Sequence, residues 1–261
     1  MKTVLIERMS WTDFRDAMEE TDAVIVPLGV MEEHGPHCPL GTDTWIARHC
    51  ARLIGEQSQT PVANVLPFGY AANVRSFPGS TSLDPDTYTQ VLLAYCGGFA
   101  AHGAKRFLFI NGHGGNTPLL GNVADKLYEA YGAISFANDW WTLLPQIAPE
   151  YDCADHGGYY ETSMLMAARP ELPQMELARA VGECAISDNI RKHYTWSFQG
   201  ASIGINCDVG KFNPYGNLGN PPMGASRELG EKLTALYVEY NVALLEEIKR
   251  IPLPFPGAER I

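Results

Sequence analysis

The sequence is poor in basic residues and has no long apolar run. Its 261 residues contain 19 Lys and Arg against 30 Asp and Glu, a formal net charge of -11. Because nucleic-acid-binding proteins neutralise phosphates with Lys and Arg, this balance argues against a nucleic-acid partner and favours a small-molecule substrate. No apolar stretch approaches the roughly 20 residues of a membrane span, so no membrane partner is expected. Glu7 and Arg8 interrupt the first segment too early for a signal peptide, and we expect a cytoplasmic protein.

Closely spaced cysteines are also missing. The six cysteines are scattered without any Cys-x-x-Cys pair. In a large cytosolic enzyme such cysteines are mostly reduced residues of the core. Cys38 is the exception, because it lies in an acidic loop and could be a soft metal ligand. The remaining composition, 46% apolar and 19% charged, excludes a disordered or fibrous protein.

Short apolar segments alternate with segments of helical periodicity along the chain. Ser10 with Asp13 three residues later is typical of a helix start, and a further helix should follow residue 156. Residues 188–222 are rich in Gly, Asn, Pro and aromatics and predict turns with one or two edge strands. We expect strands over residues 3–6, 23–28, 61–67, 106–110 and 133–137, and helices over 44–54, 84–102, 119–131 and 225–250.

This alternation is typical of a largely parallel sheet with helices on both faces. We therefore predict an α/β fold, a three-layer α/β/α sandwich around a mostly parallel central sheet. No internal repeat, low-complexity tract or linker divides the chain, so we expect one domain over residues 1–261.

The loop after the predicted strand at 23–28 concentrates metal-binding side chains. Residues 29–43 contain three carboxylates and two imidazoles between glycines and prolines. In extended chain, residues two apart share a face, so Glu32 and His34 can point the same way while Glu33 points away. Glu33 is therefore expected to support the site or to lie on the surface. Asp43 could instead cap the helix that follows.

Two later segments supply further candidate ligands. His113 lies in a Gly-rich stretch directly after the strand at 106–110, and His156 and Glu161 precede a predicted helix. Proteins with an open parallel sheet bind their ligands at the carboxyl ends of the strands, and we expect these segments to meet there. Imidazole with carboxylate suits Zn, Mn or Fe, and a bridging carboxylate suggests two ions about 3.5 to 4 Å apart. Taken alone, residues 111–116 could be only a flexible turn.

Several motifs together resemble the creatininase (creatinine amidohydrolase) family. They are the acidic loop at 32–43, Phe-Pro-Gly-Ser at 77–80, Asn-Gly-His-Gly-Gly-Asn at 111–116 and His-Gly-Gly-Tyr-Tyr-Glu-Thr-Ser at 156–163. Residues 216–221 are similar to a late Gly-x-x-Gly-Asp-Pro element of that family, with Asn220 in place of Asp. The resemblance extends over nearly the whole chain. It implies the creatininase-like fold, a metal-dependent hydrolase, two divalent metal ions with Zn first and Mn or Fe as alternatives, and a homohexamer.

The resemblance also implies how the metal ligands are divided. One ion would be held by Glu32, Asp43 and His113. The second would be held by His34, Asp43 and a further carboxylate, so that Asp43 bridges the two ions.

Two positions of the expected site need separate comment. In creatininase the further carboxylate follows the motif histidine by two residues, where this chain has Gly115. Glu161 is then the candidate for the missing ligand. His156 is similar to the catalytic histidine of the family, and we predict His156 and Glu161 as the catalytic residues.

The substrate is less clearly indicated than the chemistry. Family members act on a cyclic amidine, on formamides, on a C-terminal dipeptide bond or on an oxidised inositol ring. We predict that a metal-activated water attacks a carbonyl or C=N carbon of a small, cyclic substrate. The alternative is C–C bond hydrolysis of a keto-inositol ring. Creatinine itself is not expected, because residues 151–153, Tyr-Asp-Cys, replace a tryptophan of the creatininase pocket.

Aromatic residues near the predicted ligands are candidates for substrate binding. We predict Tyr159, Trp140 and Trp141 in this role, although aromatic residues are more often part of a core. Two other classes of protein stay open: a metal-binding protein without activity, and a nucleotide- or phosphate-binding module. Against the second, residues 111–116 have neither the GxGxxG nor the Walker spacing.

Overall fold

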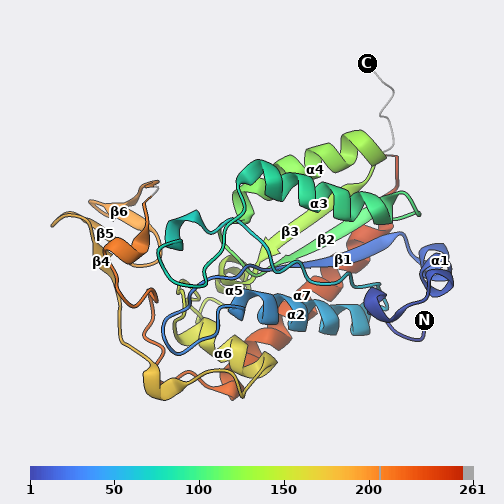
Figure 1. The fold of residues 1–261 in the computed structure, drawn as a ribbon. Coiled ribbons are helices and arrows are strands. Elements are labelled where there is room, and N and C mark those ends of the chain that lie inside the picture. Colours follow the sequence, from blue (N-terminus) through green and yellow to red (C-terminus); the bar gives the residue numbers. More distant parts are fainter. Residues whose placement is uncertain (206, 255–261) are drawn as a thin grey trace.

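A parallel sheet forms the centre of the molecule, which a computed structural model describes over residues 1–205 and 207–254 (Figure 1). Its strands are β1 (Ala23–Leu28), β2 (Arg106–Asn111) and β3 (Ile134–Asp139), in the order β1-β2-β3. The register pairs the last residues of all three strands, Leu28 with Asn111 and Asn111 with Asp139. The three loops that follow therefore leave the sheet at the same edge.

Alternate residues of the strands point into two apolar cores on opposite faces of the sheet. Val26 and Phe109 pack into the core that contains α3 and α4, whereas Ile25 and Ile110 pack into the core that contains α2, α5, α6 and α7. The helices are α1 (Trp11–Glu20), α2 (Thr42–Ser58), α3 (Pro85–Ala100), α4 (Thr117–Tyr131), α5 (Trp140–Ile147), α6 (Tyr159–Ala168) and α7 (Arg227–Arg250). Helices on both sides of the sheet confirm the predicted α/β/α sandwich (Figure 1).

Helix starts follow the sequence signals closely. The Ser10 hydroxyl accepts the Asp13 backbone N–H, and the Asp13 carboxylate accepts the Ser10 N–H, which is the capping box expected there. Asp84 caps α3 directly ahead of Pro85. Asp43 does not cap α2, because Gly41 is the N-cap and Asp43 lies in the first turn. Its carboxylate is therefore free for other contacts.

Two predicted strands are only partly formed. Residues 61–67 run beside β1 and meet it at two isolated bridges, Ile25 with Val62 and Leu28 with Leu66. Pro61 and Pro67 bound this segment and lack the N–H that a continuous ladder needs. In place of the strand at 3–6, Leu5 forms one bridge and a 3-10 turn, Ile6–Arg8, follows.

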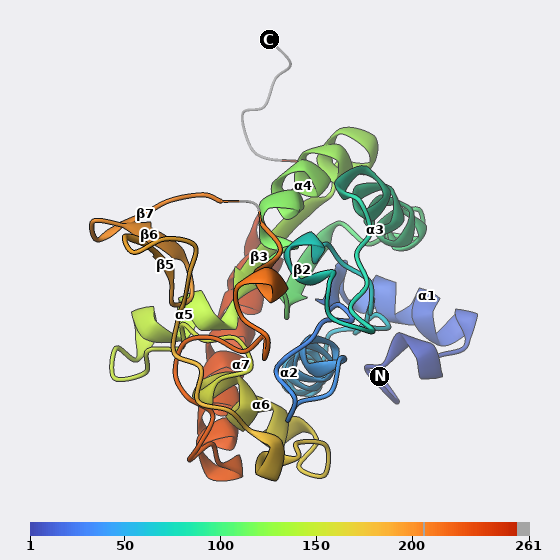
Figure 2. The same cartoon turned by 60° about the vertical axis from the view of Figure 1, so that its left-hand side comes forward.

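A second, antiparallel sheet stands beyond the carboxyl ends of the parallel strands (Figures 1 and 2). Three of its four short strands lie in residues 188–222, where one or two edge strands are expected, and the first strand lies just before that segment. A third apolar cluster, which includes Trp196, Val30 and Leu218, attaches this segment to the loops of the parallel sheet. The strands are β4 (Cys184–Ala185), β5 (Ile190–Lys192), β6 (Trp196–Phe198) and β7 (Ala201–Ser202), and further 3-10 turns are Ala72–Val74, Met175–Leu177 and Val209–Lys211.

No helix among the described residues is long and apolar enough to cross a membrane. The prediction of one domain over residues 1–261 includes residues 255–261, which lie outside the described part of the chain. It stays a prediction.

Candidate metal centre and cavity

Five of the predicted site residues meet at the carboxyl edge of the parallel sheet. Glu32 and His34 come from the loop after β1, Asp43 from the first turn of α2, His113 from the loop after β2 and Glu161 from the first turn of α6. All five are at most 6% exposed. Ionisable groups this deeply buried need charge partners, so their contacts indicate what the site is built to hold.

His34 is held through one ring nitrogen and presents the other to carboxylates. Its Nδ1 lies 3.0 Å from the backbone oxygen of Glu32. A carbonyl oxygen can only accept, so the Nδ1–H donates to it. The opposite nitrogen, Nε2, lies 2.8 Å from Asp43 Oδ1 and 3.6 Å from Glu161 Oε2.

His113 repeats this arrangement on the other side of Asp43. Its Nε2–H donates to the backbone oxygen of Tyr70 at 2.9 Å. Its Nδ1 lies 2.6 Å from Glu32 Oε2 and 3.2 Å from Asp43 Oδ2. Metal-binding histidines commonly donate their outer N–H to a carbonyl and leave the inner nitrogen for the ion.

Two carboxylate oxygens beside the imidazoles have no hydrogen-bond partner. Glu32 Oε2 and Asp43 Oδ2 are both buried and make no hydrogen bond. An unpaired buried carboxylate oxygen is costly, and a bound cation removes that cost. Three groups of three ligand atoms lie within 4.8 Å of one another: Glu32/Asp43/His113, His34/Asp43/Glu161 and Glu32/His34/His156. The first two groups share Asp43 and together use five residues, so these residues fit two divalent ions that share one carboxylate.

The electrostatics agree with a site short of positive charge. Burial alone lowers the pKa of His34, but Asp43 and Glu161 outweigh it and raise that pKa well above its ordinary value. Burial also lowers the pKa of His113, but Glu32 and Asp43 outweigh it and raise that pKa well above its ordinary value. Burial raises the pKa of Asp43, but the two imidazoles outweigh it and lower that pKa. The carboxylates around both imidazoles therefore favour positive charge at this site.

Backbone crowding at Gly115 leaves no room for a carboxylate there, and Glu161 is the carboxylate of the second ligand group. A Cβ atom at Gly115 would lie 1.9 Å from the Tyr70 carbonyl oxygen and 2.5 Å from His113 Nε2. No side chain fits at position 115, so a carboxylate there is excluded. Glu161 reaches the same region from α6, and its Oε2 also accepts the Gly157 N–H at 2.6 Å.

His156 lies next to the metal ligands and faces the cavity. Its ring centroid is 4.4 Å from that of His34, its Nε2 is 3.0 Å from Glu33 Oε1, and its side chain is 20% exposed. The other oxygen of Glu33 accepts the Gly35 N–H at 2.9 Å. Burial and His34 lower the pKa of His156, but Glu33 and Glu32 outweigh them and raise it to about 9. Glu33 therefore takes the supporting place expected of it, as the residue that orients His156.

The aromatic residues expected at the substrate site lie elsewhere. Trp140 and Trp141 are buried in the main core, with their ring centroids 5.6 Å apart. Tyr159 packs its ring on Tyr160 at 5.0 Å. None of the three is among the described residues that line the cavity. Both tryptophan rings are buried because α5 begins directly after β3, although Trp141 comes within 3.7 Å of the position that a Cβ of Gly114 would take. Substrate binding by the three aromatic residues stays a prediction.

Cys38 is also no ligand in this structure. Its Sγ lies 3.6 Å from the Thr162 hydroxyl, and burial raises the pKa of its thiol to about 12. It belongs to neither of the two ligand groups that share Asp43. All six cysteines are free thiols, as expected from their spacing.

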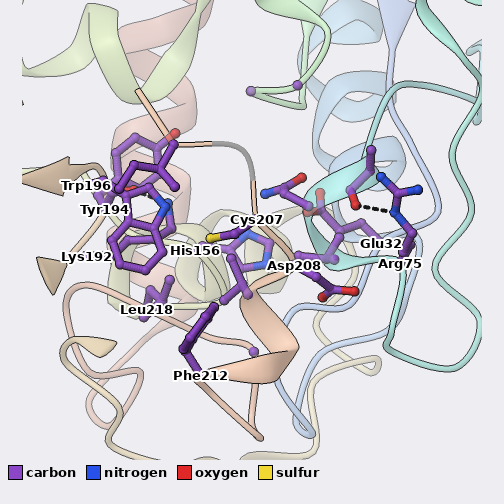
Figure 3. Close-up of a pocket in the computed structure, with 18 of the residues that line it drawn as sticks. Glu32, Arg75, His156, Lys192, Tyr194, Trp196, Cys207, Asp208, Phe212 and Leu218 are labelled. Carbon is purple, nitrogen blue, oxygen red and sulfur yellow. Dashed lines mark hydrogen bonds between the residues drawn. The ribbon is translucent and has the colours of Figure 1, made fainter. Parts of the chain in front are cut away.

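A cavity of about 850 Å³ opens over the metal ligands (Figure 3). Glu32, His113 and His156 lie at its inner end. Its outer walls come from the turn at Ala72–Val74, from β5 and β6, and from residue 205 and residues within 207–218. Most of these wall residues were not predicted from the sequence, and the only signal for some of them was the aromatic content of residues 188–222. They include Tyr70, Arg75, Lys192, Tyr194, Trp196, Asp208, Lys211 and Phe212.

Comparisons with known proteins agree with the geometry. A family model described as creatinine amidohydrolase matches residues 7–245. A mycofactocin precursor peptide peptidase from Mycolicibacterium smegmatis is 36% identical over 155 residues, 57% of this chain and 58% of that protein. A creatinine amidohydrolase from Pseudomonas putida is 27% identical over 197 residues, 67% of this chain and 75% of that protein. The match thus spans less than two thirds of the peptidase.

Solved structures share the fold over almost the whole chain. A creatininase structure described as the Mn form superposes with a TM-score of 0.76 at 22% sequence identity. The match covers 95% of this chain and 99% of that one. At this identity the likeness establishes the fold.

Proposed function

The chain belongs to the creatininase (creatinine amidohydrolase) family, and on that premise we propose that it is a hydrolase with two divalent metal ions that cleaves an amide C–N bond. The observation that carries this proposal is the pair of buried imidazoles around Asp43. Each imidazole donates its outer N–H to a backbone carbonyl and directs its inner nitrogen at carboxylate oxygens, two of which have no hydrogen-bond donor.

The ligand atoms divide into two sets in this proposal. Glu32, Asp43 and His113 hold one ion, and His34, Asp43 and Glu161 hold the other. Nitrogen and oxygen donors without thiolate suit Zn, with Mn or Fe as alternatives, and a related creatininase structure is a manganese form. When bound, such an ion pair lowers the pKa of a water molecule toward neutrality and polarises the carbonyl of the substrate.

His156 supplies the proton transfer in this mechanism. Water oxygen adds to the carbonyl carbon, the C–N bond breaks, and the departing nitrogen must take up a proton. His156 is the imidazole that borders both the cavity and the metal ligands without belonging to the two ligand sets. Its contact with Glu33 fixes the ring, so its Nδ1 edge is directed toward Glu161, 4.0 Å away. We assign His156 as the proton donor and Glu33 as its positioning residue.

The cavity argues for an enzyme over a metal-binding protein without activity. It reaches Glu32, His113 and His156, so a substrate has access to the metal end. About 850 Å³ is also near the upper end of the usual range for ligand pockets. The space accommodates an amide within a molecule larger than a single small ring, such as a short peptide, as well as the cyclic substrate predicted from the sequence.

Metal-dependent amide hydrolysis can be tested with the purified chain. Protein stripped of metal and reloaded with Zn²⁺ or Mn²⁺ is assayed on lactams, formamides, short peptides and keto-inositols. We expect an amide to be hydrolysed only by the reloaded protein, and the His156→Ala variant to keep its metals but lose at least about 100-fold in rate. Hydrolysis of keto-inositols alone would favour the C–C alternative. Metal binding without hydrolysis of any class would contradict the proposal.

Two further features rest on the family resemblance and the sequence. We propose a homohexamer, which light scattering during size-exclusion chromatography tests. A cytoplasmic location stays a prediction, and cell fractionation tests it.

A further inference from the structure

Three cations line the cavity without a carboxylate partner. Arg75, Lys192 and Lys211 all border it. Among residues 1–205 and 207–254, no carboxylate oxygen lies within 4.0 Å of their charged nitrogens. Asp208 also lines the cavity, but its carboxylate accepts the Ser76 hydroxyl at 2.7 Å and the Gly210 N–H at 3.2 Å. The outer cavity therefore has an excess of positive charge.

Lys192 is the best placed of the three cations. It is partly buried, and its Nζ donates to the Tyr194 backbone oxygen at 2.6 Å, which uses one of its three N–H donors. Its neighbour on β5, Arg191, is exposed and pairs with Glu183 at 2.6 Å. Successive side chains of a strand point to opposite faces, so β5 directs Lys192 into the cavity and Arg191 to solvent.

The wall that carries Lys192 approaches the inner end of the cavity, where Glu32, His113 and His156 lie. The Tyr194 hydroxyl lies 3.6 Å from the position that a Cβ of Gly114 would take, beside His113. Burial lowers the pKa of Lys192, and Glu32 is near enough to oppose that effect. In Figure 3, Lys192 and Tyr194 lie on one side of His156 and Arg75 on the other.

Bound metal leaves Lys192 without a counter-charge. Two divalent ions carry more positive charge than the three carboxylates of Glu32, Asp43 and Glu161 neutralise. A partly buried ammonium group beside such a centre needs an anion from outside the chain, because its desolvation is otherwise uncompensated.

We infer that Lys192 binds a carboxylate of the substrate, so that the substrate is an anionic amide. This inference rests on the proposed function for the bond that is cleaved, but the carboxylate site itself stands on the unpaired cations. The carboxylate and the scissile carbonyl belong to one molecule, since Lys192 and the candidate metal ligands Glu32 and His113 border one cavity. It can be the C-terminus of a peptide or an acidic side chain.

Matched peptides test this inference on the metal-loaded full chain. N-acetyl dipeptides are compared in three forms: free C-terminal acid, C-terminal amide, and amide with a Glu side chain. Calorimetry gives the Kd of each, and kcat/KM is measured wherever hydrolysis occurs. We expect a carboxylate form to be favoured by about tenfold or more, and the better of the two acid forms identifies the source of the carboxylate.

Variants of neighbouring residues separate the charge from the fold. Lys192→Met should reduce the preference for the acid to about one, mainly through KM, while both metals remain bound. Lys192→Arg should keep most of the preference. Arg191→Met is the matched control, because it removes a cation from the opposite face of the same strand, and the preference should not change.

The results distinguish this inference from the proposed function. Equal binding of acid and amide by the wild type, no binding of either form, or an undiminished preference in Lys192→Met overturns the carboxylate site. Preferential binding of the acid without any hydrolysis supports the site and contradicts the proposed activity.

Discussion

The metal end and the outer wall of the cavity are built in different ways. The candidate metal ligands are buried and lie after strand ends and in the first turns of α2 and α6, and backbone carbonyl oxygens hold both imidazoles. The wall consists of strands of two or three residues and of loops with partly exposed side chains. Chemistry placed on a rigid scaffold and selectivity placed on loops can change separately. The same metal centre can therefore serve different substrates when the wall is different.

The largest effect is expected from the residue shared by both ligand sets. Asp43→Asn removes the shared charge at nearly constant volume, so both ions should be lost and activity should fall by about 10³-fold or more. Elemental analysis of the purified variant gives the metal content, and Asp125→Asn on the exposed side of α4 is the control. Full metal content in Asp43→Asn contradicts the shared-ligand arrangement.

Removal of one unshared ligand should affect a single ion. Glu161→Gln keeps an acceptor for the Gly157 N–H but loses the charge beside His34, so one ion should be lost and the other kept. Activity should fall by about 10²-fold or more. Glu32→Gln is the mirror experiment at the other ion. Two ions at wild-type affinity in Glu161→Gln would show that Glu161 is not a ligand.

Two adjacent glycines at the metal loop should respond differently. Gly115→Ala places its methyl group against the Tyr70 carbonyl and His113, and should weaken binding of the nearer ion by about 10- to 100-fold. Gly114→Ala meets only ordinary contacts beyond 3.5 Å and should bind both ions like the wild type. Metal titration measures the affinity of each variant. Equal metal affinities of Gly115→Ala and Gly114→Ala would contradict the claim that no side chain fits at position 115.

Glu33 separates orientation from metal binding. Glu33→Gln keeps a hydrogen-bond partner for His156 but removes its charge, so kcat should fall by about tenfold while KM and both ions stay close to wild type. Glu20→Gln, an exposed carboxylate at the end of α1, serves as the control. A loss of metal in Glu33→Gln would move Glu33 from positioning residue to ligand.

The smallest effect is expected in the wall. Trp196 is buried in the third apolar cluster, and its ring lies 6.3 Å from that of Phe212. Trp196→Leu should loosen β6 and raise KM by about three- to tenfold, with two ions still bound. Steady-state kinetics together with metal analysis measure this. Loss of an ion would show that the wall and the metal end are coupled.

The same contrast explains how much the sequence predicted. Strands β1 and β2 were predicted, over residues 23–28 and 106–110, because each contains a short, mainly apolar run. The candidate ligands that follow β1 and β2 were predicted to lie together because parallel strands bring their carboxyl ends to one edge of the sheet. The wall was not found, because β5 and β6 are too short to show a period, and their register depends on distant contacts such as that of Trp196 with its cluster.

Core and pocket aromatics could not be separated by composition alone. Trp140 and Trp141 directly follow a strand end, as a pocket residue would, yet both are buried among apolar side chains. Lys192 and Tyr194 gave no signal for the opposite reason. A single lysine or tyrosine in an irregular segment is usually a surface residue, and only the fold brings these two beside His156 and Gly114.

Anomalous X-ray diffraction from crystals loaded with Zn²⁺ or Mn²⁺ tests the central claim most directly, because it gives both the number and the position of bound ions. We expect two peaks per chain on either side of the Asp43 carboxylate, one beside Glu32 and His113 and the other beside His34 and Glu161. A single peak, or a second peak that Glu161 does not contact, would contradict the proposed centre.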